Sequence, residues 1–360
     1  MSGTISPYGN LAQIIANTTH VHTALDTLTE QSSSGLVAQS YAGLGANAAV
    51  TLDLSPEVQH LQTWQNAIGS VAGPMNIAQN TLTQISSVAS TFYAALNNVD
   101  STNATETASV AANAQQALQQ VASLLNAQYN NAYVFAGTDT ANPPVPNANG
   151  ILQSSFTTQI QSAVSGLTST NASATFQTIL AVGSSNDPST SPFSTSLSQD
   201  AATVNAHLPV VQAGEGQSQI TAIAASTNAF VASTGTATTG SYMRDIMVSL
   251  ATIGSITTAQ TSNGSDLQNL VQSTRTCLSG AITALNQDAG VLGNTQSSLT
   301  TQQTNLADQQ TTLSGQVSNA QDVDMAKTLS ALSQAQTQLQ ASYQVIAAIS
   351  GLSLSKFLPA

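Results

Sequence analysis

The sequence predicts a mainly α-helical protein, in which long helices from both chain ends pair in a coiled-coil-like bundle around a small central insert. Two observations predict this class. Apolar residues recur at alternating steps of three and four along both ends of the chain. Between about 141 and 240, Gly, Pro, Ser and Thr concentrate instead, so this insert is expected to be irregular or to contain a β-hairpin.

The N-terminal part of the chain predicts three helices. The first, over residues 8–34, carries a coiled-coil seam formed by Leu11, Ile14, Thr18, Val21, Leu25 and Leu28. The second is expected to start at Ser55 and Pro56, a capping residue followed by a residue suited to the first helical position, and to run to about residue 99. Gly73-Pro74 should kink or briefly break it. The third helix is expected from about 104 to 130.

The central insert contains two short apolar-periodic stretches, near 151–168 and 172–182, that predict short helices. The stretch "HLPVVQAGEGQSQITAI" alternates around a Gly-rich turn, which predicts a hairpin near 207–223.

Helical periodicity returns over about 265–318, and a last helix is expected over about 322–350. Cys277 falls on the apolar seam of the former, which predicts a buried residue rather than a reactive thiol. Residues in register on the last helix are Met325, Leu329, Leu332, Leu339, Tyr343 and Ile346.

The chain ends on "LQASYQVIAAISGLSLSKFLPA", whose only charged residue is Lys356. Ordering a segment of this length costs roughly 1–2 kcal/mol per residue, while burying an aliphatic side chain returns roughly 1.5–3 kcal/mol. One stripe of the N-terminal helix cannot cover the whole tail, so other copies of the protein are expected to do so. The predicted assembly interface comprises Leu11, Ile14, Val21, Leu25, Leu28, Leu339, Tyr343, Ile346, Ile349, Leu352, Leu354, Phe357 and Leu358.

Composition excludes several classes of partner. Charged residues make up 6% of the chain, against roughly 25% in an ordinary soluble domain. With four Lys and Arg residues and a net charge of −12, the chain has no basic stripe for nucleic acid. No stretch approaches the length of a membrane span, and the N-terminus does not read as a cleaved secretory signal. We therefore expect neither nucleic acid nor membrane as a partner.

Residues typical of catalytic and metal sites are scattered. His20 and His22 point in different directions on a helix, and His60 and His207 stand alone. Asp322 and Asp324 stand at the start of the last helix, where carboxylates favour the helix dipole. We expect no catalytic site, cofactor or metal, and therefore no enzyme.

Two stretches resemble the bacterial flagellins together with hook-associated protein 3, the hook-filament junction protein. The ending "DVDMAKTLSALSQAQTQLQASYQVIAAISGLSLSKFL" is similar to the family's C-terminal signature of paired aspartates, a Gln/Leu-rich helix and a Leu-Ser-Leu tail. The stretch "LDTLTEQSSSGLVAQSYAGLGANAAV" resembles the family's N-terminal helix, turn and small-residue loop, without its basic pair after the glycine or its Asp-rich loop. The stretch "NAYVFAGTDTANPPV" is similar to the junction protein's motif.

The resemblance implies a structural subunit of the flagellar axial structure that supports motility. Its implied partners are other copies of itself, neighbouring axial proteins (flagellin and hook-associated proteins), the type III export apparatus and an export chaperone. Its implied location is the extracellular flagellum. The resemblance also implies a domain layout: a terminal coiled-coil assembly domain (1–40 and 320–360), a helical rod (41–140 and 241–319) and a variable outward-facing segment (141–240).

Two alternatives stay open from the sequence. Within the family, the chain fits a small filament flagellin as well as the junction protein. Outside it, a secreted adhesin or fibre protein would explain the helical length and the low charge, though not the C-terminal signature.

Overall fold

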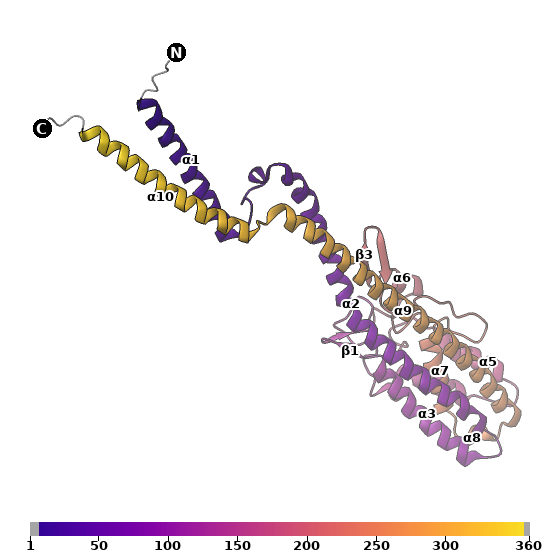
Figure 1. Ribbon diagram of the computed structural model, residues 1–360. Helices are drawn as coiled ribbons and strands as arrows, with labels where there is room; N and C mark the ends of the chain where they lie inside the picture. The colour runs from indigo at the N-terminus through magenta and orange to yellow at the C-terminus, as the bar shows by residue number, and fades with distance from the viewer. Residues whose placement is uncertain (1–6, 356–360) are drawn as a thin grey trace. The chain divides into compact units, whose positions relative to one another are not determined.

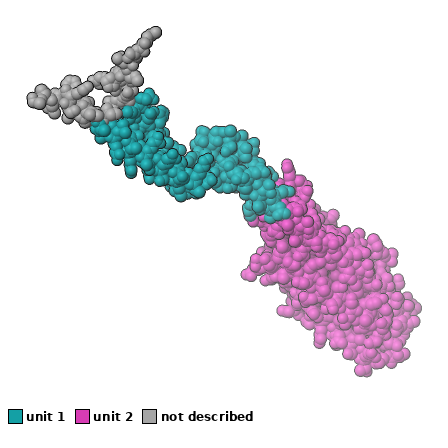
Figure 2. Space-filling view, in the orientation of Figure 1, with its two compact units in different colours: residues 1–62, 307–360 teal, residues 63–306 magenta. Residues whose placement is uncertain are grey.

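The fold is mainly helical, and the predicted class is confirmed: helices account for 69% of the chain. In this computed structural model, the backbone is described for residues 7–355 and the side chains for residues 12–348. The described chain divides into two compact units, residues 1–62 with 307–360 and residues 63–306 (Figures 1 and 2). Each is built from both arms of the chain, because helices from the two arms pair along their length.

The first unit holds the terminal helices. It contains α1 (Pro7–Ser34), the 3-10 helix η1 (Tyr41–Asn47), the beginning of α2 (Ala48–Ala95), the end of α9 (Gly264–Gln321) and α10 (Met325–Ser355). Helices α1 and α10 lie side by side and run in opposite directions (Figure 1). The predicted pairing of the two chain ends is therefore confirmed.

Backbone hydrogen bonds join the two connections that leave this helix pair. Leu36 and Asp322 form an isolated antiparallel bridge. Val37 N donates to Gln321 O at 2.7 Å, and Val323 N donates to Gly35 O at 2.9 Å. Gly35 has a φ of 74°, a left-handed conformation that glycine adopts without the steric cost of a side chain. The ends of α1 and α9 are thus held together where both arms change direction.

The second unit is built on the pairing of α2 with α9. Apolar residues along both helices are fully buried, among them Met75, Leu82 and Ile85 of α2 and Leu285 and Leu292 of α9. Neutral amide side chains add hydrogen bonds across the pair: Gln79 Nε2 donates to Ala289 O at 2.8 Å, and Gln296 Nε2 donates to Asn76 Oδ1 at 2.8 Å. Packing of apolar side chains and hydrogen bonds between neutral groups therefore hold these helices together.

Helix α7 (Tyr242–Gly254) lies at the centre of this unit, packed against α3 (Ala104–Leu124), and all its residues are buried. The remaining elements are short: η2 (Leu96–Asn98), η3 (Ile151–Gln153), α4 (Ser155–Ser165), α5 (Ala172–Gly183), α6 (Ala201–Ala206) and α8 (Thr258–Thr261). α4 and α5 correspond to the two short helices predicted in the insert.

Two small hairpins complete the unit. Strands β1 (Gln128–Tyr129) and β2 (Ala132–Tyr133) are joined by Asn130 and Asn131, both with positive φ, as a two-residue type I′ turn requires. Strands β3 (Val210–Gly214) and β4 (Gln217–Ile220) form the hairpin that the sequence predicts near 207–223.

Several helix boundaries differ from those predicted. Helix α2 begins at Ala48 rather than Ser55, and it continues without interruption through Gly73 and Pro74. Gly73 has a packing role instead, because an added Cβ would lie 2.3 Å from the ring of Tyr129. Helix α3 ends at Leu124, short of the predicted residue 130, because the following residues turn into the first hairpin.

Candidate assembly surface

The α1·α10 pair covers only part of its own apolar surface. Between residues 12–34 and 325–348, three side chains on these helices are buried: Thr18, Thr328 and Ala335. The rest of the seam is half-buried, namely Ile14, Val21, Leu25 and Leu28 on α1 with Leu332, Leu339 and Ile346 on α10. Small or polar residues occupy the tightest positions, so this pair has a thin core.

Large apolar side chains lie exposed beside this seam. Ile15, Leu329 and Tyr343 are 51%, 51% and 52% exposed. Each directly follows a seam residue, and in an antiparallel pair such positions on the two helices lie along the same edge. We call these three residues the apolar edge. Leu329 and Tyr343 lie about four turns apart on α10. The edge is therefore a row of separate apolar side chains, and a partner covering them would remove apolar surface from water.

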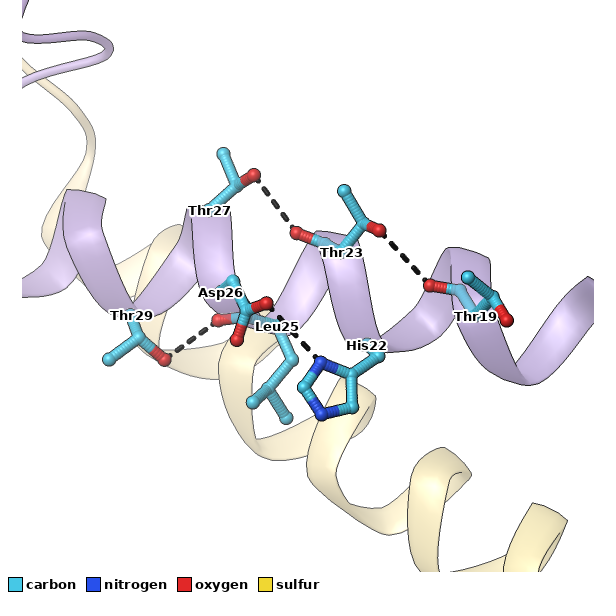
Figure 3. A network of polar contacts seen from close by, with 7 residues as sticks. All are labelled: Thr19, His22, Thr23, Leu25, Asp26, Thr27 and Thr29. Atoms are coloured by element: carbon cyan, nitrogen blue, oxygen red, sulfur yellow. Dashed lines mark hydrogen bonds and ion pairs between the residues drawn. The ribbon is translucent and has the colours of Figure 1, made fainter.

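The polar face of α1 satisfies its own hydrogen bonds (Figure 3). The Thr23 hydroxyl donates to Thr19 O at 3.1 Å, and the Thr27 hydroxyl donates to Thr23 O at 3.0 Å. These side chains therefore present their methyl groups outward and need no external partner for their hydroxyl protons. A neighbouring helix covering this face would leave none of these donors unpaired.

His22 and Asp26 form an ion pair on the same helix, with 3.2 Å between Nδ1 and Oδ2 (Figure 3). Both side chains are more than half exposed. An exposed pair of this type contributes little to stability. Association of α1 with α10 therefore depends on the seam.

The structure places the predicted interface residues in three groups. Ile14, Val21, Leu25, Leu28, Leu339 and Ile346 contribute to the seam within the chain, and Tyr343 lies on the apolar edge. The side chains of Leu11, Ile349, Leu352, Leu354, Phe357 and Leu358 lie outside the described residues. Sequence reasoning missed Ile15. It placed Met325, Leu329 and Tyr343 in register with the seam, but all three are exposed, and the structure buries Thr328 instead of Leu329.

The residues considered for chemistry have structural roles. Asp324 Oδ1 accepts a hydrogen bond from Lys327 N at 3.1 Å, so it caps the start of α10. Cys277 is 2% exposed, and burial raises the pKa of its thiol, so the predicted core position is confirmed. Within residues 12–348, no three His, Cys, Asp or Glu side chains are arranged to hold a metal ion.

Two family models match the chain at its two ends. The model of the bacterial flagellin N-terminal helical region matches residues 5–140, and that of the bacterial flagellin C-terminal helical region matches residues 275–358. The chain belongs to the bacterial flagellin family. The matched segments contain α1, α2, α3 and α10 and most of α9, so the paired helices are the elements that characterise the family.

Membership of the flagellin family makes the chain a structural subunit of the flagellum, not an enzyme. Such proteins assemble with other axial subunits and are exported to the extracellular flagellum. No match to the chain was found among curated proteins. None of the helices described is long and apolar enough to cross a membrane.

Proposed function

We propose that this flagellin-family protein joins the axial structure of the flagellum through the α1·α10 pair, with the apolar edge covered by another copy of the chain. The observation that carries the proposal is the exposure of Ile15, Leu329 and Tyr343 beside a seam that is already occupied. The seam residues named above hold the two chain ends together. Ile349, Leu352, Leu354, Phe357 and Leu358 extend the contact to neighbouring subunits.

The proposal extends to the organisation of the chain. Residues 1–40 and 320–360 form the assembly domain, 41–140 and 241–319 form the rod, and 141–240 face outward. An export chaperone covers the apolar chain ends before assembly. The apolar edge supports the need for a chaperone, because copies of the protein with this edge uncovered would associate prematurely inside the cell.

The direct test replaces Tyr343 by Ser. Because this side chain is half exposed in the single chain, the variant monomer should keep its helix content and its melting temperature. Losing a buried aromatic at each subunit contact is worth roughly 1.5–3 kcal/mol, which should raise the critical concentration for assembly about tenfold or more. Circular dichroism of the monomer and sedimentation of assembled material measure the two quantities.

Two controls interpret the result. Gln340→Ser changes an exposed residue elsewhere on α10 and should assemble normally. Leu339→Ser removes a seam residue and should weaken the helix pair within the monomer itself. If Tyr343→Ser assembles at the wild-type critical concentration, the apolar edge is not a subunit contact.

The stretch "NAYVFAGTDTANPPV" favours the hook-filament junction as the position of this subunit, whereas the filament itself is the general role of the family. Electron microscopy of cells lacking the protein separates the two. Hooks without filaments would assign it to the junction. Missing or shortened filaments on intact junctions would assign it to the filament.

A further inference from the structure

The second unit contains a small cavity lined mostly by polar residues, and the packing of the helices does not explain it. The cavity measures about 120 Å³. Four segments line it: Ser184 and Asn186 after α5, Gln199 and Ala201 at the start of α6, Ser226 and Thr227, and Thr239, Gly240, Ser241 and Arg244 at the start of α7. None of its lining residues carries a carboxylate. Since a water molecule occupies about 30 Å³ in the liquid, the space would hold about four waters or one small oxyanion.

Arg244 supplies a buried positive charge to this cavity. Its side chain is 4% exposed and bonds only neutral acceptors: Nε donates to Ser226 O at 3.0 Å, Nη1 to Gly183 O and Ser185 O at 3.0 and 2.9 Å, and Nη2 to Asn186 Oδ1 at 3.0 Å. These bonds use four of the five N–H donors of the guanidinium group. The fifth, on Nη2, has no acceptor within the described part of the chain.

Burial lowers the pKa of Arg244 to about 10, and attraction to the nearby Asp245 carboxylate offsets part of this shift, so the group stays charged at neutral pH. The carboxylate next to it in sequence, Asp245, accepts hydrogen bonds from Thr238 and Thr239. Asp245 does not line the cavity, and among the described residues no ion pair joins it to Arg244. A buried cation without a contacting anion is costly, because neutral acceptors offset only part of its lost hydration.

Ser226 is the second observation that points to a ligand. Its side chain is 2% exposed, its Oγ has no hydrogen-bond partner among the described residues, and Ser226 is one of the residues that line the cavity. Native proteins rarely leave a buried hydroxyl unpaired. Ser241 adds another donor, because its Oγ accepts from Arg244 N at 3.5 Å and keeps its own proton free. The N-terminus of the 13-residue helix α7, at the same place, favours negative charge.

We propose that this cavity binds a small tetrahedral oxyanion of the phosphate or sulfate class, held by Arg244, Ser226 and Ser241. The Phe193 ring lies 5.3 Å from the guanidinium carbon, and Asp245 attracts the charge without touching it. Water alone would satisfy the hydroxyl groups but leave the guanidinium group with no anion in contact. The bound ion joins the residues after α5, the turn at Ser226 and the start of α7. The ion therefore holds the central segment against the helical core.

The experiment is a titration of the full-length monomer with sodium sulfate or sodium phosphate at constant ionic strength, with chloride as the balancing ion. A ligand that binds only the folded state raises the melting temperature in a saturable way. We expect saturation with sulfate and phosphate. Acetate, a planar carboxylate, tests whether the site prefers tetrahedral anions. It should raise the melting temperature less than sulfate does, or not at all.

Two serine variants provide the matched comparison. Ser226→Ala removes a donor from the cavity and should weaken sulfate binding about tenfold, as expected for a hydrogen bond to a charged group. Ser249 is a fully buried serine on α7, the helix of Arg244, and it does not line the cavity. Ser249→Ala should therefore leave the sulfate affinity unchanged. Isothermal titration calorimetry on both variants gives the affinities directly.

Three outcomes would overturn the proposal. The first is the absence of any saturable effect, which would make the cavity a water site. The second is an equal loss of affinity in both serine variants, which would place the ion elsewhere. The third is tighter binding of acetate than of sulfate, which would reassign the cavity to a carboxylate.

Discussion

Individual carboxylates anchor the loops of the central segment to the helices of the core. The clearest case is Asp288 on α9, whose side chain is fully buried. It accepts hydrogen bonds from Ala229 N at 3.0 Å, from Phe230 N at 3.1 Å and from the Tyr242 hydroxyl at 2.9 Å. Burial raises the pKa of this carboxyl group, and these three donors partly offset that effect. One residue thus links a loop, α7 and α9.

Replacing Asp288 by Ala should destabilise the monomer strongly. The change leaves two backbone N–H groups and the buried Tyr242 hydroxyl unpaired, at about 1–3 kcal/mol for each. We expect a total loss of about 3 kcal/mol or more, measured by urea unfolding. The control Tyr242→Phe removes one donor and keeps the carboxylate bonded to the backbone, so it should cost only about 1 kcal/mol. Equal losses in the two variants would show that Asp288 does not anchor the loop.

At the scale of elements, the sequence predicts the helix pairs well and their ends poorly. The alternating spacing from Ile14 to Leu28 identified the seam of α1, because burial on one face enforces this periodicity. The start of α2 was predicted seven residues too late, since Pro56 suits a first turn but is tolerated inside this helix. Tertiary packing along α2 and α9 outweighs the local signals there and at Pro74.

The candidate sites show the same division. Tyr343 was predicted in register with the seam of the last helix but lies exposed beside it, whereas Ile15 was missed because it lies one position off the seam. The cavity beside Arg244 could not be predicted at all. Its lining residues are spread from Ser184 to Arg244, in segments without a regular pattern, and only the folded chain brings them together.

The two helix pairs should differ in local stability. On α1 and α10, three of the described side chains are buried, and α1 contains several β-branched threonines that lower helix propensity. The α2·α9 pair buries apolar residues along its whole length in the second unit. In hydrogen exchange of the monomer, amides of α1 and α10 should therefore exchange far faster than amides of α2 around Leu82 and of α9 around Leu292.

Assembly provides the control for this measurement. When neighbouring copies cover the apolar edge, protection of α1 and α10 should rise towards that of the second unit. If α1 and α10 of a demonstrably monomeric sample exchange as slowly as α2, the thin seam is sufficient by itself. The argument that these helices need other subunits would then be wrong.

At the scale of the whole molecule, charge is scarce and unbalanced. The chain carries 16 acidic residues against four Lys and Arg, and the pair formed by His22 and Asp26 is exposed. Apolar seams and neutral amides hold the helices together, and these interactions depend little on salt. The net charge of −12 acts between molecules instead, because every copy repels every other copy.

Salt should therefore affect folding and assembly differently. Raising NaCl from about 0.01 M to about 0.15 M shortens the screening length from about 30 Å to about 8 Å, which removes most of the repulsion between approaching subunits. We expect the monomer's melting temperature to change by no more than a few degrees, since buried apolar residues and hydrogen bonds between neutral amides hold the helices together. Over the same range, the critical concentration for assembly should fall. Chloride is the appropriate anion, because sulfate would also bind at Arg244.

Light scattering and thermal melting of one preparation measure both effects. A critical concentration that rises with salt would mean that attraction between opposite charges guides subunit contact, and the apolar edge would then be secondary to a charge pairing between copies.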